Sequence, residues 1–146
     1  MRVFHDRLTT DEDRNYLKEM LTKYFTDFGY KKEDVIDVDR ILFCDFNQNR
    51  DSEVRPYVQI DDLNGLVLKM DGFQEEYNND ISFIINGPRT PMKLVMFLDA
   101  CEHIARIARI IRQPQGNSLV LGVGGSGRQS LSRIATYLQG YKLFQI

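Results

Sequence analysis

The residues that could do chemistry lie together near the C-terminal end of the printed sequence. From Gly122 to Ser130 the chain reads Gly-Val-Gly-Gly-Ser-Gly-Arg-Gln-Ser. Glycines allow positive φ angles and leave room for a ligand beside the backbone. Where such a loop leads into a helix, unpaired N–H groups and the positive end of the helix dipole point at one place. The stretch therefore predicts a site for an anion, and phosphate is its natural occupant.

The glycine spacing of this loop is that of the P-loop of nucleotide-binding proteins. Gly122, four intervening residues and Gly127 match the motif, in which Lys and then Ser or Thr follow. Arg128 instead stands where Lys reaches the β- and γ-phosphates, so the charge is kept on a bulkier planar group. Gln129 stands where a hydroxyl coordinates Mg²⁺, and Ser130 follows one place later. We therefore expect nucleotide binding with weak or absent hydrolysis.

The candidate ligand-binding residues form one continuous run, with ATP or ADP as the expected ligand. They are Gly122, Val123, Gly124, Gly125, Ser126, Gly127, Arg128, Gln129 and Ser130. Gln129 and Ser130 are also the candidate ligands of Mg²⁺, a candidate cofactor. No catalytic residue is assigned, because no Ser or Cys nucleophile has a base at motif spacing.

The loop requires a strand before it and a helix after it, and the sequence has both patterns. The apolar run from Asn117 to Gly122 is typical of a buried parallel strand. Helical spacing of apolar residues follows the loop as far as Gly140, and residues 141–146 begin a second strand. The order of strand, Gly-rich loop, helix and strand predicts an α/β fold.

Three earlier helices are predicted upstream of the loop. Thr9 and Glu12 have the spacing of a capping box, and helical periodicity runs from there to about Phe28, before Gly29. A second helix covers roughly residues 61–77. The third has an apolar stripe that begins at Leu94, and it ends near Arg112. Residues 30–56 lack periodicity and are interpreted as a connector.

Composition limits the class of protein. The 146 residues suffice for one domain with a modest core, and 42% hydrophobic with 27% charged residues is ordinary for a soluble globular chain. A formal charge of −2 argues against nucleic acid as a partner, and no run approaches the ~20 apolar residues of a membrane span. Cys44 and Cys101 are far apart and predict neither a zinc site nor a disulfide framework.

The other polar residues that could indicate a site have simpler interpretations. His103 has no second histidine or carboxylate pair to complete a metal-ligand set. Arg106, Arg109 and Arg112 are expected on the solvated side of the third helix. Cys101 lies on the apolar stripe of that helix and is expected in the core.

The sequence around the loop resembles the fourth AAA+ module of axonemal dynein heavy chains. The resemblance rests on residues 98–107, on Ile111-Arg-Gln-Pro-Gln-Gly, on Leu121-Gly-Val-Gly-Gly-Ser-Gly-Arg-Gln-Ser-Leu and on Gly140-Tyr-Lys-Leu-Phe-Gln-Ile. The Gly-Arg-Gln-Ser ending resembles the variant of axonemal heavy chains, in place of a Gly-Lys-Thr form. The opening Arg-Val-Phe-His-Asp-Arg-Leu is similar to the helical lid that ends the third module.

This resemblance implies a fold and a division of the chain. The fold is that of a P-loop NTPase of the AAA+ class, present as a partial large subdomain preceded by a helical lid and connector. Residues 1–55 would be the lid of the preceding module and the connector. Residues 56–146 would be the N-terminal part of a module, with its P-loop at residues 122–130.

The resemblance also implies a function in a minus-end-directed microtubule motor that moves cilia and flagella. The fourth module would bind ATP or ADP and tune the motor cycle rather than drive it. The implied partners are neighbouring AAA+ modules of the ring and, through the parent chain, dynein intermediate chains, light chains and microtubules. The implied location is the cytoplasm and cytoskeleton, in the axoneme of a cilium or flagellum. The printed sequence ends before any strand with an Asp-Glu pair, so we do not expect this chain alone to hydrolyse ATP.

Two alternatives stay open at this point. In the first, the loop binds nothing and the region is a structural or interaction segment of the ring, which nucleotide affinity would distinguish. In the second, the chain is an independent phosphate-transferring enzyme, which requires a Mg²⁺-binding acidic pair and a base. Asp99 and Glu102 are the only nearby candidates, and both fit a helix surface better.

Overall fold

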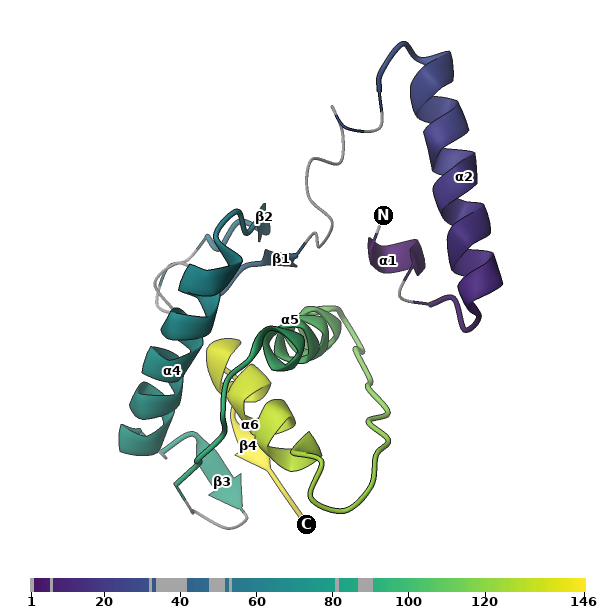
Figure 1. The fold of residues 1–146 in the computed structure, drawn as a ribbon. Coiled ribbons are helices and arrows are strands. Elements are labelled where there is room, and N and C mark those ends of the chain that lie inside the picture. The colour runs from purple at the N-terminus through teal and green to yellow at the C-terminus, as the bar shows by residue number, and fades with distance from the viewer. Residues whose placement is uncertain are drawn as a thin grey trace. The chain divides into compact units, whose positions relative to one another are not determined.

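The computed structural model divides into two compact units, Met1–Ile41 and Leu42–Ile146 (Figure 1). It describes residues 2–5, 7–31, 33, 42–47, 52, 54–80, 82–86 and 91–146. Leu42, Cys44 and Phe46 belong to the buried core of the second unit, and the division into residues 1–55 and 56–146 stays a prediction. The identity of the first unit as the lid of a preceding module stays a prediction.

The described part of the first unit contains α1 (Arg2–His5) and α2 (Asp11–Asp27). The cap of α2 is one residue later than predicted, because the hydroxyl of Thr10 accepts a hydrogen bond from Asp13 N at 3.1 Å. Acidic side chains in the first turn add favourable charge at the positive end of the helix dipole. The helix ends at Asp27 with Phe28 as its C-cap, and Gly29 follows with φ of +81°, close to the end that the sequence predicts.

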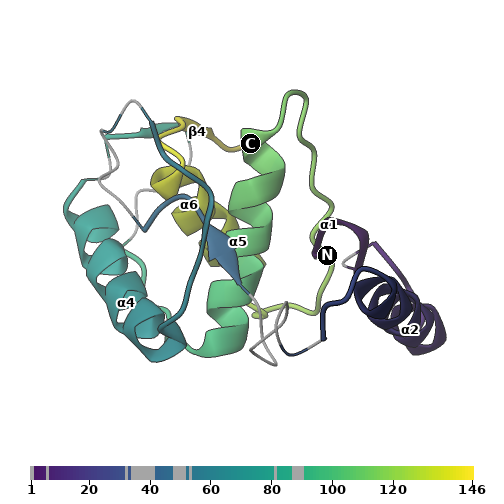
Figure 2. The same cartoon turned by 90° about the horizontal axis from the view of Figure 1, so that it is seen from above.

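Three helices and two short strand pairs form the described part of the second unit (Figures 1 and 2). The helices are α4 (Leu63–Asn79), α5 (Leu98–Arg112) and α6 (Arg128–Leu138). The strands are β1 (Phe43–Cys44), antiparallel to β2 (Val58–Gln59), and β3 (Ile84–Asn86), parallel to β4 (Leu143–Phe144). The chain is therefore of mixed α/β class. Within the described ranges, none of the helices combines the length and apolar composition that crossing a bilayer requires.

The core of the second unit lies where the three helices meet, and α6 lies beside both α4 and α5 (Figures 1 and 2). Small side chains on α5, among them Cys101, Ala105 and Ala108, let neighbouring elements approach closely. The buried residues of α5 and α6 are Ala100, Cys101, Ile104, Ala105, Ile107, Ala108, Ile134, Ala135, Tyr137 and Leu138. Burial of Cys101 confirms its predicted place in the core.

The start of α5 differs from the sequence prediction. The helix begins at Leu98, whereas the apolar stripe begins at Leu94. Residues 91–97 are not helical, because side chains of α4 bind their backbone. Leu94 N donates to Gln74 Oε1 at 2.7 Å, and the neighbouring bonds of this segment go to the same helix. Met92 N and Leu94 N thus have acceptors on α4, and these tertiary contacts stabilise the non-helical backbone of the segment.

The predicted strand at Asn117–Gly122 is wrong. Residues 117–123 form no strand, and Leu119, Leu121 and Val123 are 85%, 78% and 80% exposed. Only Val120 in this segment packs partly against the core. A strand needs a hydrogen-bonded neighbour, and among the described residues β3 pairs with β4 instead. The second strand, predicted at residues 141–146, is confirmed as β4.

A buried carboxylate joins three parts of the second unit. Asp45 is 2% exposed, and its Oδ2 lies 2.8 Å from Arg112 Nη1 at the end of α5. Its Oδ1 accepts a hydrogen bond from Gln139 Nε2, just after α6, at 2.9 Å. Arg55 adds hydrogen bonds from its guanidinium to the carbonyl oxygens of Leu138 and Gln139. These contacts fix the C-terminal ends of both helices to the segment around β1, so Arg112 is more than a solvated side chain.

We expect Asp45→Ala to lower the free energy of unfolding by about 2–3 kcal/mol, because it leaves the buried Gln139 amide without its acceptor and Arg112 without its counter-ion. Urea denaturation followed by circular dichroism measures this change. Glu76→Ala, which removes an exposed carboxylate of α4, is the matched control and should change stability by no more than about 0.5 kcal/mol. Equal effects of the two substitutions would contradict the assignment.

Candidate functional site

The glycine-rich loop leads directly into α6, as the sequence predicts. Gly127 is the N-cap of this helix with φ of +76° and ψ of 3°, a left-handed conformation that favours glycine. Its carbonyl accepts the first helical hydrogen bond, from Leu131 N at 2.9 Å. No side chain caps this end of α6. The N–H groups of the first turn have no partner within the helix, so they are available to an anion.

Gly122 is required because other side chains of the loop approach its backbone closely, not because its φ angle is positive. A β-carbon on Gly122 would lie 2.7 Å from Ser126 Oγ and 3.3 Å from Arg128 Cδ, so a larger residue would push both side chains away. Ser126 N also donates to Val123 O at 3.2 Å, which closes the loop on itself. A β-carbon on Gly124 would meet nothing within 4 Å. The loop is therefore tight at Gly122 and open at Gly124.

The last three residues of the 122–130 run, which form the first turn of α6, differ in exposure. Arg128 is half-buried, with its side chain beside Gly122, whereas Gln129 is exposed and Ser130 is half-buried. Successive residues of a helix project about 100° apart, so Gln129 and Ser130 point in different directions. Within the part of the chain that the structure describes, no three His, Cys, Asp or Glu residues gather as a metal site. The assignment of Gln129 and Ser130 as Mg²⁺ ligands stays a prediction.

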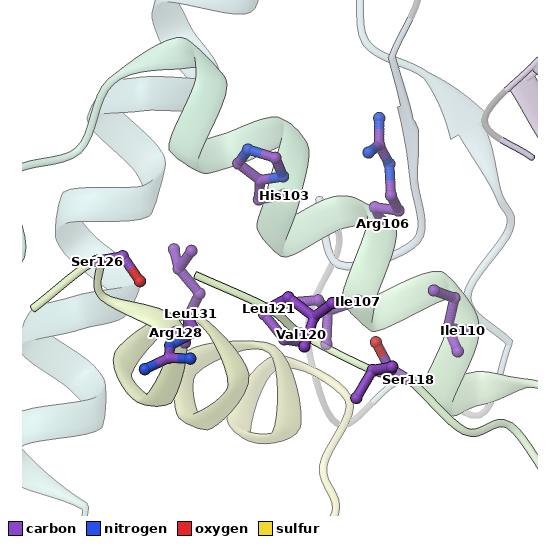
Figure 3. Close-up of a pocket in the computed structure, with 11 residues that line it drawn as sticks. His103, Arg106, Ile107, Ile110, Ser118, Val120, Leu121, Ser126, Arg128 and Leu131 are labelled. Carbon is purple, nitrogen blue, oxygen red and sulfur yellow. The ribbon is translucent and has the colours of Figure 1, made fainter. Parts of the chain in front are cut away.

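A cavity of about 410 Å³ lies beside the loop (Figure 3). Figure 3 shows Ser126 and Arg128 at the start of α6, and His103 and Arg106 on α5. The other lining residues are Ile107, Ile110, Ser118, Leu119, Val120, Leu121 and Leu131. Apolar residues thus form most of the lining, with one cation, Arg128, at the start of α6 and another, Arg106, on α5 (Figure 3).

Sequence reasoning identified only Ser126 and Arg128 of this lining. The helical spacing of His103, Ile107 and Ile110 was a usable signal, since residues three and four apart share one face. The segment from Ser118 to Leu121 was missed because it was assigned to a buried strand.

The two cysteines are free thiols and are buried. Burial raises the pKa of the Cys44 thiol to about 11, and burial likewise raises the pKa of the Cys101 thiol to about 11. Both thiols are therefore protonated near neutral pH.

We expect both thiols to react with iodoacetamide at pH 8 about a hundredfold more slowly in the folded chain than in denaturant, because the thiolate is the nucleophile. Mass spectrometry of the alkylated chain measures the rates. Since the folded-state pKa values are raised, stability should be unaffected below about pH 9 and should fall as the pH rises from about 9 to about 11. Fast alkylation of the native chain would contradict the described burial.

Known proteins match this chain over nearly its whole length. Residues 92–146 match the family described as P-loop containing dynein motor region D4. Dynein axonemal heavy chain 1 of Mus musculus is 40% identical over 145 residues, 99% of this chain. Dynein axonemal heavy chains 6 and 3 of Homo sapiens are 40% and 38% identical over 153 and 157 residues, again 99% of this chain. The chain spans only 3–4% of the length of these relatives. The chain therefore matches one segment of axonemal dynein heavy chains over nearly its whole length, and its residues 92–146 match P-loop containing dynein motor region D4.

Proposed function

We propose that residues 122–130 bind the phosphates of ATP or ADP. The observation that carries this proposal is the uncapped N-terminus of α6, entered through Gly127 in the left-handed conformation. Backbone N–H groups of the first helical turn would donate to phosphate oxygens, and the helix dipole would favour their negative charge. The match of residues 92–146 to a P-loop containing dynein region supports nucleotide as the ligand.

The last three residues of this run, Arg128, Gln129 and Ser130, would bind the nucleotide and its metal ion rather than catalyse hydrolysis. Arg128 keeps a positive charge next to the loop and would pair with phosphate oxygens. Gln129 and Ser130 would supply oxygen ligands to Mg²⁺. A bound Mg²⁺ would neutralise part of the negative charge of the phosphates. The Arg and Gln depart from the usual Lys and Ser or Thr, so we propose a regulatory site with weak or absent hydrolysis.

The wider role follows from the parent chain. The relatives are axonemal dynein heavy chains, and we propose that this segment serves the AAA+ ring of a minus-end-directed microtubule motor in cilia or flagella. Its direct partners would be the neighbouring modules of that ring, and microtubules and smaller dynein chains would be reached through the parent chain. Residues 1–55 would be the lid and connector before the partial large subdomain.

We expect Mg-ATP and Mg-ADP to bind the chain, and Arg128→Ala to weaken binding at least about tenfold, because a charge-assisted contact to phosphate is lost. Isothermal titration calorimetry measures both affinities. Lys142→Ala is the matched control, since it removes an exposed cation outside the loop. A folded chain that binds neither nucleotide would overturn the proposal and favour a structural segment of the ring.

We also expect Gln129→Thr to increase the dependence of ADP affinity on Mg²⁺, because a hydroxyl is restored where the P-loop motif places one. The measured quantity is the ratio of ADP dissociation constants with EDTA and with Mg²⁺. Thr136→Gln, further along the same helix, is a control for the change of residue type. An unchanged ratio would mean that position 129 does not face the metal.

A further inference from the structure

We infer that Gln74 and Asn78 of α4 are positioning residues for the phosphate loop and act through residues 91–97, here called the 91–97 segment. The inference rests on the proposed role of the loop in binding nucleotide. It goes beyond that role, because neither residue lies in the loop, in the helix that follows it or in the cavity beside it.

The two amide side chains hold the 91–97 segment in a fixed register. Asn78 makes two hydrogen bonds with Met92: its Oδ1 accepts from Met92 N at 2.6 Å, and its Nδ2 donates to Met92 O at 2.9 Å. Gln74 Oε1 accepts from Leu94 N at 2.7 Å. Gln74 and Asn78 are four residues apart and so lie on one face of α4. Side chains of α4 thereby form hydrogen bonds with the backbone of the 91–97 segment, in the place that a neighbouring strand would take in a sheet.

The held segment alternates between core and solvent. Met92 and Met96 are buried and Leu94 is half-buried, whereas Lys93 and Val95 are exposed. This alternation places the side chain of Leu94 on the inner side of the segment. A shift of register by one residue would bring Lys93 to that side and would break all three hydrogen bonds.

Leu94 links the segment to the loop. A β-carbon placed on Gly127 would lie 3.6 Å from Leu94 Cδ1, so the side chain of Leu94 bounds the space beside this glycine. Gly127 is the residue at which the loop turns into α6, and its carbonyl accepts the first hydrogen bond of that helix from Leu131. The position of Leu94 therefore restricts the turn that aims the N–H groups of the first helical turn.

The two amides differ in what can replace them. Gln74 only accepts a hydrogen bond from the segment, so Gln74→Glu keeps the contact, whereas Gln74→Met loses it at similar size. Asn78 both accepts and donates, so Asn78→Asp keeps one bond and places a carboxylate against the carbonyl of Met92. A positioning role predicts that Glu is tolerated at residue 74 and Asp is not tolerated at residue 78.

The test is amide hydrogen exchange by NMR on the ligand-free chain. We expect Gln74→Met to speed exchange of the Leu131 amide about tenfold, with core amides of α5 unchanged, because the turn at Gly127 opens locally. Gln74→Glu should restore the rate. Leu94→Ala, which keeps the backbone bonds but removes the methyl groups that bound the space beside Gly127, should give the same increase. Glu75→Met, an exposed position of α4, is the matched control and should change nothing.

Two results would overturn the inference. One is a Leu131 amide that exchanges at the original rate in folded Gln74→Met and Leu94→Ala chains. The other is a uniform increase across α5 and α6, which would mean general loss of stability. The exchange rates are measured without nucleotide, whereas the unsubstituted chain is titrated with ATP separately. Failure of the positioning role is thereby distinguished from failure of the proposed nucleotide binding.

Discussion

The packing of α6 against α5 is the contact on which the rest of the second unit depends. Small residues such as Ala105 and Ala108 let the helices lie close, and Ile134 and Leu138 are buried in the same core. This contact fixes the axis of α6 and therefore the direction in which its first-turn N–H groups point. The far end of α6 is held separately, through Gln139 and the buried carboxylate of Asp45. A loop at the N-terminus of a helix can bind a ligand reproducibly only if the helix itself does not move.

The sequence predicted those helix ends and turns that are determined by residues close together in the chain. The end of α2 just before Gly29, the end of α5 at Arg112 and the turn at Gly127 depend on residues within a few positions of each other. Sequence reasoning failed where the deciding group is distant in sequence. Gln74 keeps Leu94 out of the helix from 20 positions away, and no local pattern carries that information. Likewise, an apolar run shows that a strand can form but not whether a partner strand is present.

The candidate site divides in the same way. The glycines and the cation of the loop were recognisable because their chemistry is local and their spacing is a motif. The close approach of Ser126 and Arg128 to Gly122 was not visible, because it depends on how the loop folds back on itself. The buried network around Asp45 was also missed, since a carboxylate in a polar stretch gives no sign that an arginine 67 positions later will meet it.

The exposed row of Leu119, Leu121 and Val123 has a consequence for the behaviour of the chain in solution. The whole stretch from residue 113 to residue 127 carries no charged side chain. Two molecules that meet along this stretch experience no mutual charge repulsion, and an apolar row on an extended backbone is the pattern by which strand edges associate. A region that contributes little to the core thus offers an uncharged apolar surface along which copies of the chain can associate.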